Sequence, residues 1–357
     1  MKRESTRRGF LKRIGVGALG LGFGVSVFEG IYQFAEALTD EEAHALLRKG
    51  TVNFMGFMAQ EITPNEEFYI TNYSSTIPNV DADTFQLRIE GLVEKPYTLT
   101  MKDLQTMRDK LDFVTLQCIG NPLGGDAIGN ALWEGVTLRK IIEKAMPKRG
   151  LVKTVFFAED GYSDSIPYPL SLSEDVFLAF KMNGKDLPKI HGYPLRVIVP
   201  GIYGMKNVKW LSKIELVNFD FKGYWEKKGW SDEAIIPVKS QILMPMEGKK
   251  IPFGHYVIGG LAYGGRYGIS KVQVSLDGGK KWEDADIKKP LSKWAWTLWS
   301  YQWKPLKENR YTIKVRGFDR SGKVQESGPL KGHLFRSGSF PDGAKGIHSV
   351  GVTAQKT

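Results

Sequence analysis

The chain has very little cysteine: Cys118 is the only one among 357 residues. A single thiol cannot form an intrachain disulfide, and it excludes haem attachment through a C-x-x-C-H motif. The five histidines are dispersed, and the motifs G-x-S-x-G and H-E-x-x-H are absent, which leaves a hydrolase as a weak alternative. Cys118 itself has two interpretations, an inert buried side chain or a thiolate ligand of a metal.

Long runs of one kind are also missing. The formal net charge is +11, yet no sustained Lys/Arg run occurs, so we expect no nucleic-acid binding. Scattered basic residues are better suited to an acidic redox partner or an anionic substrate. After residue 37 there is no apolar run of 18 residues. With 42% hydrophobic and 25% charged residues, the composition is ordinary for a globular protein.

The first 37 residues contain an export pattern. Arg7 and Arg8 form a twin-arginine pair, residues 14–27 are apolar and rich in glycine, and residues 35–37 (AEA) are a candidate cleavage site. Twin-arginine signals are addresses read by a bacterial receptor. We therefore expect residues 1–37 to be a twin-arginine signal peptide and the mature protein to be periplasmic. An uncleaved N-terminal anchor is the alternative.

The next part of the chain mixes helical and strand patterns. Residues 39–42 (TDEE) have the form of a capping box, and Gly50 ends the helix that they begin. Alternating or continuous apolar residues predict strands near 85–89, 114–118, 155–158 and 195–199, and residues 138–145 have helical spacing. We predict a helix and linker over residues 38–52 and a mixed α and β domain over 53–235, hence an α+β fold class.

From residue 236 to about 336 only strands and turns are indicated. About 100 residues of short strands favour an immunoglobulin-like β-sandwich over residues 236–340, followed by a C-terminal tail over 341–357. The segment 294–303 (WAWTLWSYQW) places bulky residues at even positions and then at odd positions, which predicts a β-bulge. Its many large apolar side chains exceed what one small sandwich needs for its core, so we expect a homodimer through this domain.

A family resemblance begins at the cysteine. Residues 115–121 (TLQCIGN) and 128–138 (IGNALWEGVTL) resemble the molybdenum-ligand loop of the sulfite oxidase family of molybdopterin enzymes. The resemblance continues through 178–184 (LAFKMNG), 191–196 (HGYPLR), 199–201 (VPG) and 204–211 (GMKNVKWL). The sandwich is similar to that family's C-terminal dimerisation domain. The implied fold is a sulfite-oxidase-type molybdopterin domain followed by the sandwich.

The resemblance implies roles for individual residues. Cys118 would be the one protein thiolate on molybdenum, beside the sulfurs of a molybdopterin cofactor. The residues that match cofactor contacts are Tyr69, Ile70, Thr71, Asn72, Tyr73, Asp160, His191, Arg196, Asn207, Val208 and Lys209. The residues that match the reaction pocket are Trp133 and Phe180. An arginine fork with backbone N–H groups suits a phosphate such as that of the pterin.

Three positions depart from the family pattern for sulfite. Two arginines that would hold the anion are Thr71 and Leu123 here, and a pocket tyrosine is Phe180. A pocket without these charges should bind a bare dianion poorly. We therefore expect oxo transfer on a small, less charged sulfur- or nitrogen-containing compound, with electrons exchanged with a separate redox protein. The alternatives are a periplasmic sulfite dehydrogenase and a non-catalytic binding or assembly protein that retains the fold.

Overall fold

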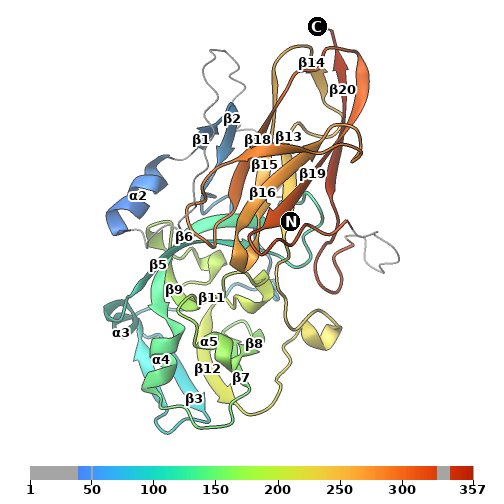
Figure 1. Ribbon diagram of the computed structural model, residues 1–357. Coiled ribbons are helices and arrows are strands. Elements are labelled where there is room, and N and C mark those ends of the chain that lie inside the picture. The colour runs from blue at the N-terminus through green and yellow to red at the C-terminus, as the bar shows by residue number, and fades with distance from the viewer. Residues whose placement is uncertain (1–38, 50, 328–337, 357) are drawn as a thin grey trace.

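The computed structural model describes residues 39–49, 51–327 and 338–356. The expected signal peptide therefore lies outside the described residues. Two β-rich parts follow each other along the chain (Figure 1). The last strand of the first part is β12 (Leu211–Val217), and the first strand of the second part is β13 (Lys239–Met244). Within the described residues, no helix is long and apolar enough to cross a membrane.

The chain enters the first part through α2 (Asp40–Lys49). The predicted capping box is confirmed, because the backbone N–H of Thr39 donates to Glu42 Oε2 at 2.9 Å and that of Glu42 donates to Thr39 Oγ1 at 3.3 Å. Two short strands follow, β1 (Thr51–Phe54) and β2 (Phe57–Gln60), which pair with each other. This hairpin leads to the segment that carries Tyr69 to Tyr73.

Two sheets build the first part. One has the order β10-β9-β6-β5, with β11 also paired to β9. Its strands are β5 (Lys110–Gln117), β6 (Ile128–Thr137), β9 (Phe177–Met182), β10 (Lys185–Asp186) and β11 (Arg196–Ile198). The other has the order β4-β3-β12-β7-β8, with β3 (Gln86–Gly91), β4 (Tyr97–Thr100), β7 (Lys153–Ala158) and β8 (Ser163–Pro167). The helices α3 (Met101–Thr106), α4 (Leu138–Lys144) and α5 (Tyr168–Ser171) connect them.

Strand β6 lies at the centre of the first sheet, and the sequence analysis did not predict it. Nine of its ten residues are buried, so it lacks the alternation that marks a half-exposed strand. The register with β9 shifts at Glu134 and Gly135. A Cβ at Gly135 would meet the carbonyl oxygen of Leu178 at 1.8 Å, so only glycine allows this approach. The cysteine loop leaves the sheet between β5 and β6.

The second part is one eight-stranded sheet with the order β13-β15-β18-β17-β16-β19-β20-β14. Its further strands are β14 (Lys250–Pro252), β15 (Tyr256–Tyr263), β16 (Ile269–Ser275), β17 (Glu283–Ile287), β18 (Thr297–Trp303), β19 (Asn309–Asp319) and β20 (His348–Gln355). Residues from both ends of this order, such as Ile242, Trp299 and Ile313, share one hydrophobic core. Residues 341–357, predicted to form a tail, instead contribute β20, which pairs with β19.

The tryptophan-rich segment corrects two expectations. Strand β18 pairs with β15 without any shift of register, so the β-bulge prediction is wrong. Bulky residues occupy both even and odd positions of the segment because both faces of β18 are buried. Leu298 packs with Phe57 and Tyr203, whereas Trp299 packs in the core of the second part. The four tryptophans of the segment are at most 8% exposed. They therefore provide no free apolar surface, and our argument for a dimer from them is wrong.

The same segment joins the two parts of the chain. The Thr115 backbone N–H donates to Trp294 O at 3.0 Å, and the Trp296 N–H donates to Thr115 Oγ1 at 2.8 Å. The indole N–H of Trp296 reaches Glu61 O at 3.1 Å. Because Thr115 lies on β5 just before the cysteine, the second part of the chain supports the strand that carries Cys118.

Candidate active site

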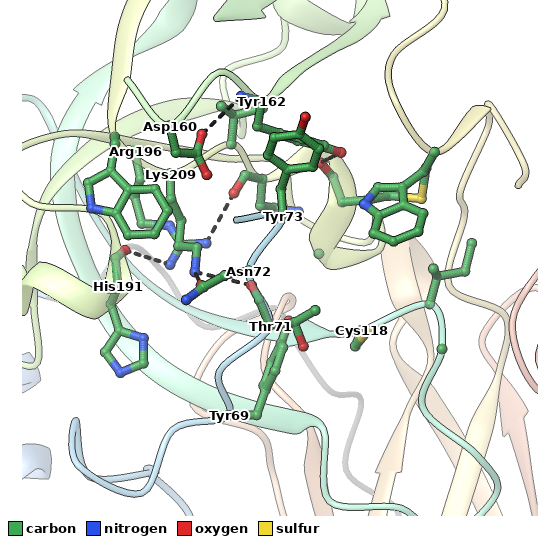
Figure 2. Close-up of a pocket in the computed structure, with 18 of the residues that line it drawn as sticks. Tyr69, Thr71, Asn72, Tyr73, Cys118, Asp160, Tyr162, His191, Arg196 and Lys209 are labelled. Atoms are coloured by element: carbon green, nitrogen blue, oxygen red, sulfur yellow. Dashed lines mark hydrogen bonds between the residues drawn. The ribbon is translucent and has the colours of Figure 1, made fainter. Parts of the chain in front are cut away.

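One cavity of about 220 Å³ is formed beside the cysteine loop, in the first part of the chain (Figure 2). Cys118 follows β5 directly, and its backbone N–H donates to Ala127 O at 3.0 Å, which closes the loop before β6. The thiol is partly exposed and lines the cavity. Figure 2 shows it well separated from Arg196 and Lys209, which line the same cavity.

The structure brings most of the predicted cofactor contacts to this cavity. Ten of the eleven line it together with Cys118; they are Tyr69, Thr71, Asn72, Tyr73, Asp160, His191, Arg196, Asn207, Val208 and Lys209. These residues come from four separate segments of the chain. The exception is Ile70, whose side chain is 54% exposed and does not contribute to the lining.

The two residues predicted for the reaction pocket do not line the cavity. Phe180 belongs to the hydrophobic core around β3 and α4, while its neighbour Ala179 packs on the other side of β9. Because β9 is buried on both faces, the sequence could not show which face lies toward the cavity. Trp133 is fully buried, and its indole N–H donates to Val114 O at 3.1 Å. The prediction of pocket positions for Phe180 and Trp133 is therefore corrected.

Trp133 instead supports Arg196. The guanidinium carbon of Arg196 lies 4.9 Å from the centroid of the Trp133 ring. Arg196 also donates from one terminal nitrogen to His191 O at 3.0 Å and from the other to Asn207 O at 3.2 Å. Its buried Nε atom has no hydrogen-bond partner among the described residues. Burial lowers the pKa of Arg196 to about 10, which leaves it a cation at neutral pH.

Lys209 is the second cation of the lining. Its ammonium donates to Thr71 O at 3.1 Å, to Ile190 O at 3.2 Å and to the Asn72 side chain, so it joins the two segments on either side of it. Burial lowers the pKa of Lys209 to about 7, and the nearby Arg196 acts in the same direction. Burial also lowers the pKa of His191 to about 4, so this imidazole is neutral. An anion bound here would favour the charged form of Lys209.

Aromatic side chains form another wall of the cavity, and sequence reasoning missed most of them. The rings of Tyr73 and Tyr162, which both line the cavity, lie 5.8 Å apart. Tyr224 does not line the cavity but supports Tyr73 from behind, with an edge-on contact at 4.7 Å. Trp225 and Trp230 also line the cavity and contact each other edge-on at 6.5 Å. Three aromatics within residues 224–230 (YWEKKGW) were the available signal.

The donor set fits a molybdopterin cofactor. Arg196 supplies a buried cation with an unused N–H, Lys209 supplies an amine that an anion would keep charged, and Cys118 supplies a soft thiol in the same cavity. A thiolate is a suitable ligand for a transition metal such as molybdenum, and an arginine fork suits a phosphate. Within the described residues, no cluster of three or more His, Cys, Asp or Glu side chains could hold a metal by itself.

The sequence matches two family models in the order of these two parts. Residues 74–225 match the oxidoreductase molybdopterin binding domain, and residues 233–332 match the Mo-co oxidoreductase dimerisation domain. The chain is 32% identical over 312 residues to sulfite oxidase from Gallus gallus, covering 74% of this chain and 68% of that protein. The chain belongs to the sulfite oxidase family of molybdopterin-dependent oxidoreductases.

Further comparisons agree with this assignment. Sulfite oxidase from Arabidopsis thaliana is 32% identical over 298 residues, covering 66% of this chain and 76% of that protein. The mitochondrial sulfite oxidase from Rattus norvegicus is 30% identical, and the alignment spans only 57% of its length. The sulfane dehydrogenase SoxCD from Paracoccus pantotrophus has a similar fold, with a TM-score of 0.68 and 24% identity over 86% of this chain and 87% of that one.

Family membership gives the cofactor its place in the site. Cys118 would bind the molybdenum, and Arg196, Lys209 and the segment from Tyr69 to Tyr73 would hold the pterin and its phosphate. When bound, such a cofactor would supply the redox chemistry of the site. The lining residues named above would bind and orient it, and their hydrogen bonds to one another keep the cavity preformed.

Proposed function

We propose that this protein transfers an oxygen atom to or from a small sulfur- or nitrogen-containing compound and exchanges electrons with a separate redox protein. One observation carries the proposal: Cys118 and the buried, incompletely paired Arg196 line a single cavity. The first offers a metal ligand and the second an anchor for an anionic cofactor. The remaining wall of the cavity, formed by Tyr73, Trp225 and Trp230, offers apolar surface to a substrate.

The charges around the cavity support a weakly charged substrate. Lys209 already donates hydrogen bonds to three oxygen atoms, and Arg196 donates to the carbonyl oxygens of His191 and Asn207. Thr71 stands at a lining position where an arginine would be needed to hold a dianion. A small dianion that loses its water must be compensated by ion pairs and hydrogen bonds, and Arg196 and Lys209 would not supply them while they hold the phosphate of the cofactor.

The test is a pair of assays on cofactor-loaded protein. Sulfite is titrated against an artificial electron acceptor, and a panel of S-oxides and N-oxides is offered with an artificial donor. We expect turnover of an S-oxide or N-oxide and weak sulfite oxidation. Efficient turnover of micromolar sulfite would contradict the proposed substrate class, and fully active protein without molybdenum or tungsten would contradict the whole proposal.

One observation favours sulfite oxidation as a second candidate. Lys239, at the start of β13, lies outside the cavity lining, with Nζ 4.9 Å from the centroid of the Tyr203 ring, and it is close enough to Cys118 for the thiolate to raise its pKa. Burial lowers its pKa to about 7, so it is a cation in part of the molecules. A dianion near Cys118 would favour the charged form. Lys239→Met would then abolish sulfite turnover and leave S-oxide reduction intact.

We further propose export to the periplasm and assembly as a homodimer with immunoglobulin-like second domains. Arg7 and Arg8 support export, and the match to the dimerisation domain over 233–332 supports the dimer. Replacing both arginines by lysine should retain folded, cofactor-loaded protein in the cytoplasm. Light scattering at micromolar concentration should give the mass of two chains, and a monomer would contradict the dimer.

A further inference from the structure

A buried charge cluster lies directly behind the cavity wall formed by Tyr162. Its centre is Lys206, whose ammonium donates to Asp164 Oδ1 at 2.8 Å, to Asp232 Oδ1 at 3.0 Å and to Glu226. The side chains of Lys206, Asp164 and Glu226 are at most 2% exposed, whereas Asp232 is 27% exposed and also pairs with Lys153 and Lys222. None of these charged side chains contributes to the cavity lining.

The fully buried part of this cluster holds one cation and two carboxylates. With both carboxylates ionised, Lys206, Asp164 and Glu226 would carry one net negative charge away from water, which is costly. One proton on a carboxyl group makes the three neutral. The cluster is therefore built to take up and release a proton.

Hydrogen-bond geometry places that proton on Asp164. A proton on Glu226 Oε2 would have no acceptor, since that buried atom has no partner among the described residues. Asp164 Oδ2, in contrast, lies 2.7 Å from the hydroxyl oxygen of Tyr162. The other oxygen, Oδ1, accepts from Lys206 and from the backbone N–H of Ser165 at 2.7 Å. Only Oδ2 is free to carry a proton and donate it.

The Tyr162 hydroxyl has two acceptors and one proton. It lies 2.7 Å from Asp164 Oδ2 and 3.0 Å from Met205 O. When Asp164 is ionised, the hydroxyl donates to the carboxylate. When Asp164 is protonated, it donates to Tyr162, and the Tyr162 proton turns to Met205 O. Both contacts are then hydrogen bonds.

Tyr162 and Met205 both line the cavity that Cys118 lines. We propose that Tyr162 and Asp164 form a proton-transfer pair for the reaction in this cavity. The Tyr162 O–H bond breaks as an O–H bond forms on a substrate oxygen, and the proton of Asp164 Oδ2 moves to Tyr162 to replace it. In the opposite direction of oxo transfer, the same pair removes a proton. This inference rests on the proposed function, because oxygen-atom transfer exchanges protons with water.

The surrounding charges set the working range of the pair. Burial raises the pKa of Asp164 to about 7; Lys206 opposes this shift, and Glu226 adds to it. Burial likewise raises the pKa of Tyr162, and Asp164 acts in the same direction, so the hydroxyl stays protonated unless it passes its proton on. Asp160 also faces Tyr162, and Lys209 faces Asp160. A donor with a pKa near the working pH transfers protons most effectively.

The test begins with infrared pH titration of the purified protein. Wild type should show a protonated carboxyl band that disappears with a midpoint near pH 7, and Asp164→Asn should lack it. Tyr162→Phe should keep the band at a shifted position. Absence of a band that Asp164→Asn removes would overturn the proposal, whether or not any variant is active.

Activity measurements then test the transfer. Tyr162→Phe and Asp164→Asn should each lower kcat at least tenfold, with KM changed less than twofold. In wild type, kcat should change with pH around pH 7, and this limb of the pH profile should be absent in Asp164→Asn. Glu226→Gln is the matched control for lost charge: the pH above which kcat falls should be lower, because Glu226 raises the pKa of Asp164, and kcat should match that of wild type only below this pH. Tyr224→Phe removes a neighbouring hydroxyl and should leave kcat and the limb unchanged.

Unchanged kcat and pH profile in Tyr162→Phe and Asp164→Asn would overturn the proposal. A failure of the proposed function is distinguishable, since it would appear as missing molybdenum or as inactivity of wild type on every oxo compound. The infrared band of Asp164 would still be present in that case.

Discussion

The guanidinium carbon of Arg196 lies 4.9 Å above the ring of Trp133, and this stacking aims the arginine at the cavity. Trp133 is buried and hydrogen-bonded to Val114 O at 3.1 Å, so it is a fixed support. The sequence resemblance had placed Trp133 in the reaction pocket. The structure places it in the layer behind the cavity lining, where it supports Arg196.

This relationship predicts the effect of a conservative exchange. Arg196→Lys keeps a positive charge but cannot stack or reach both His191 O and Asn207 O. We expect the cofactor content to fall at least tenfold while the protein remains folded, as measured by pterin fluorescence and circular dichroism. Arg316→Lys is the matched control, because Arg316 stacks on Trp282 at 4.2 Å in the second part of the chain. Normal cofactor content in Arg196→Lys would contradict the assigned role.

Cys118 offers a second prediction, helped by its being the only thiol. Iodoacetamide should label cofactor-free protein at Cys118 and should not label cofactor-loaded protein, because a metal-bound thiolate is protected. Cys118→Ser should keep the pterin, held by Arg196 and Lys209, but lose turnover and alter the metal's absorption spectrum. Mass spectrometry after labelling measures the first effect. Equal labelling of loaded and cofactor-free protein would refute Cys118 as the ligand.

Sequence patterns predicted most of the residues that line the cavity but not the buried residues behind them. The ordered motifs around Cys118, Arg196 and Lys209 identified the cavity lining through their resemblance to a family, since none of these residues was specific by itself. Strands that are buried on both faces show no alternation of apolar and polar residues, so β6 was not predicted and Phe180 was placed on the wrong side of β9. The Tyr162–Asp164 pair was also beyond reach, since it depends on Lys206, which is 42 residues away from Asp164.

The junction between the two parts predicts a stability effect. Trp296 is 1% exposed, and both its backbone and indole N–H groups bond to the first part of the chain. Trp296→Ala should lower the free energy of unfolding by about 3–5 kcal/mol, as for other buried aromatic residues. Chemical denaturation measures this change. Trp282→Ala, at a partly exposed tryptophan, is the control and should cost clearly less. Equal costs would show that the junction contributes no particular stability.

Lys239 predicts a pH dependence of stability in cofactor-free protein. Burial lowers its pKa to about 7 in the folded state, with Cys118 acting in the opposite direction. In the unfolded chain a lysine has a pKa of about 10.4. Between these values the unfolded chain binds a proton that the folded chain does not, so this residue makes the free energy of unfolding rise with pH from about 7 to about 10. Lys209 contributes to the same rise, because its pKa is also lowered to about 7. Lys239→Met should therefore make the rise of the free energy of unfolding with pH smaller without removing it. The measurement is Tm against pH for wild type and variant, with Lys271→Met as the control, since Lys271 also lies over an aromatic ring, 4.6 Å from the centroid of Phe318. A difference in Tm between wild type and Lys239→Met that stays constant from pH 7 to 10 would show that Lys239 keeps its proton on folding.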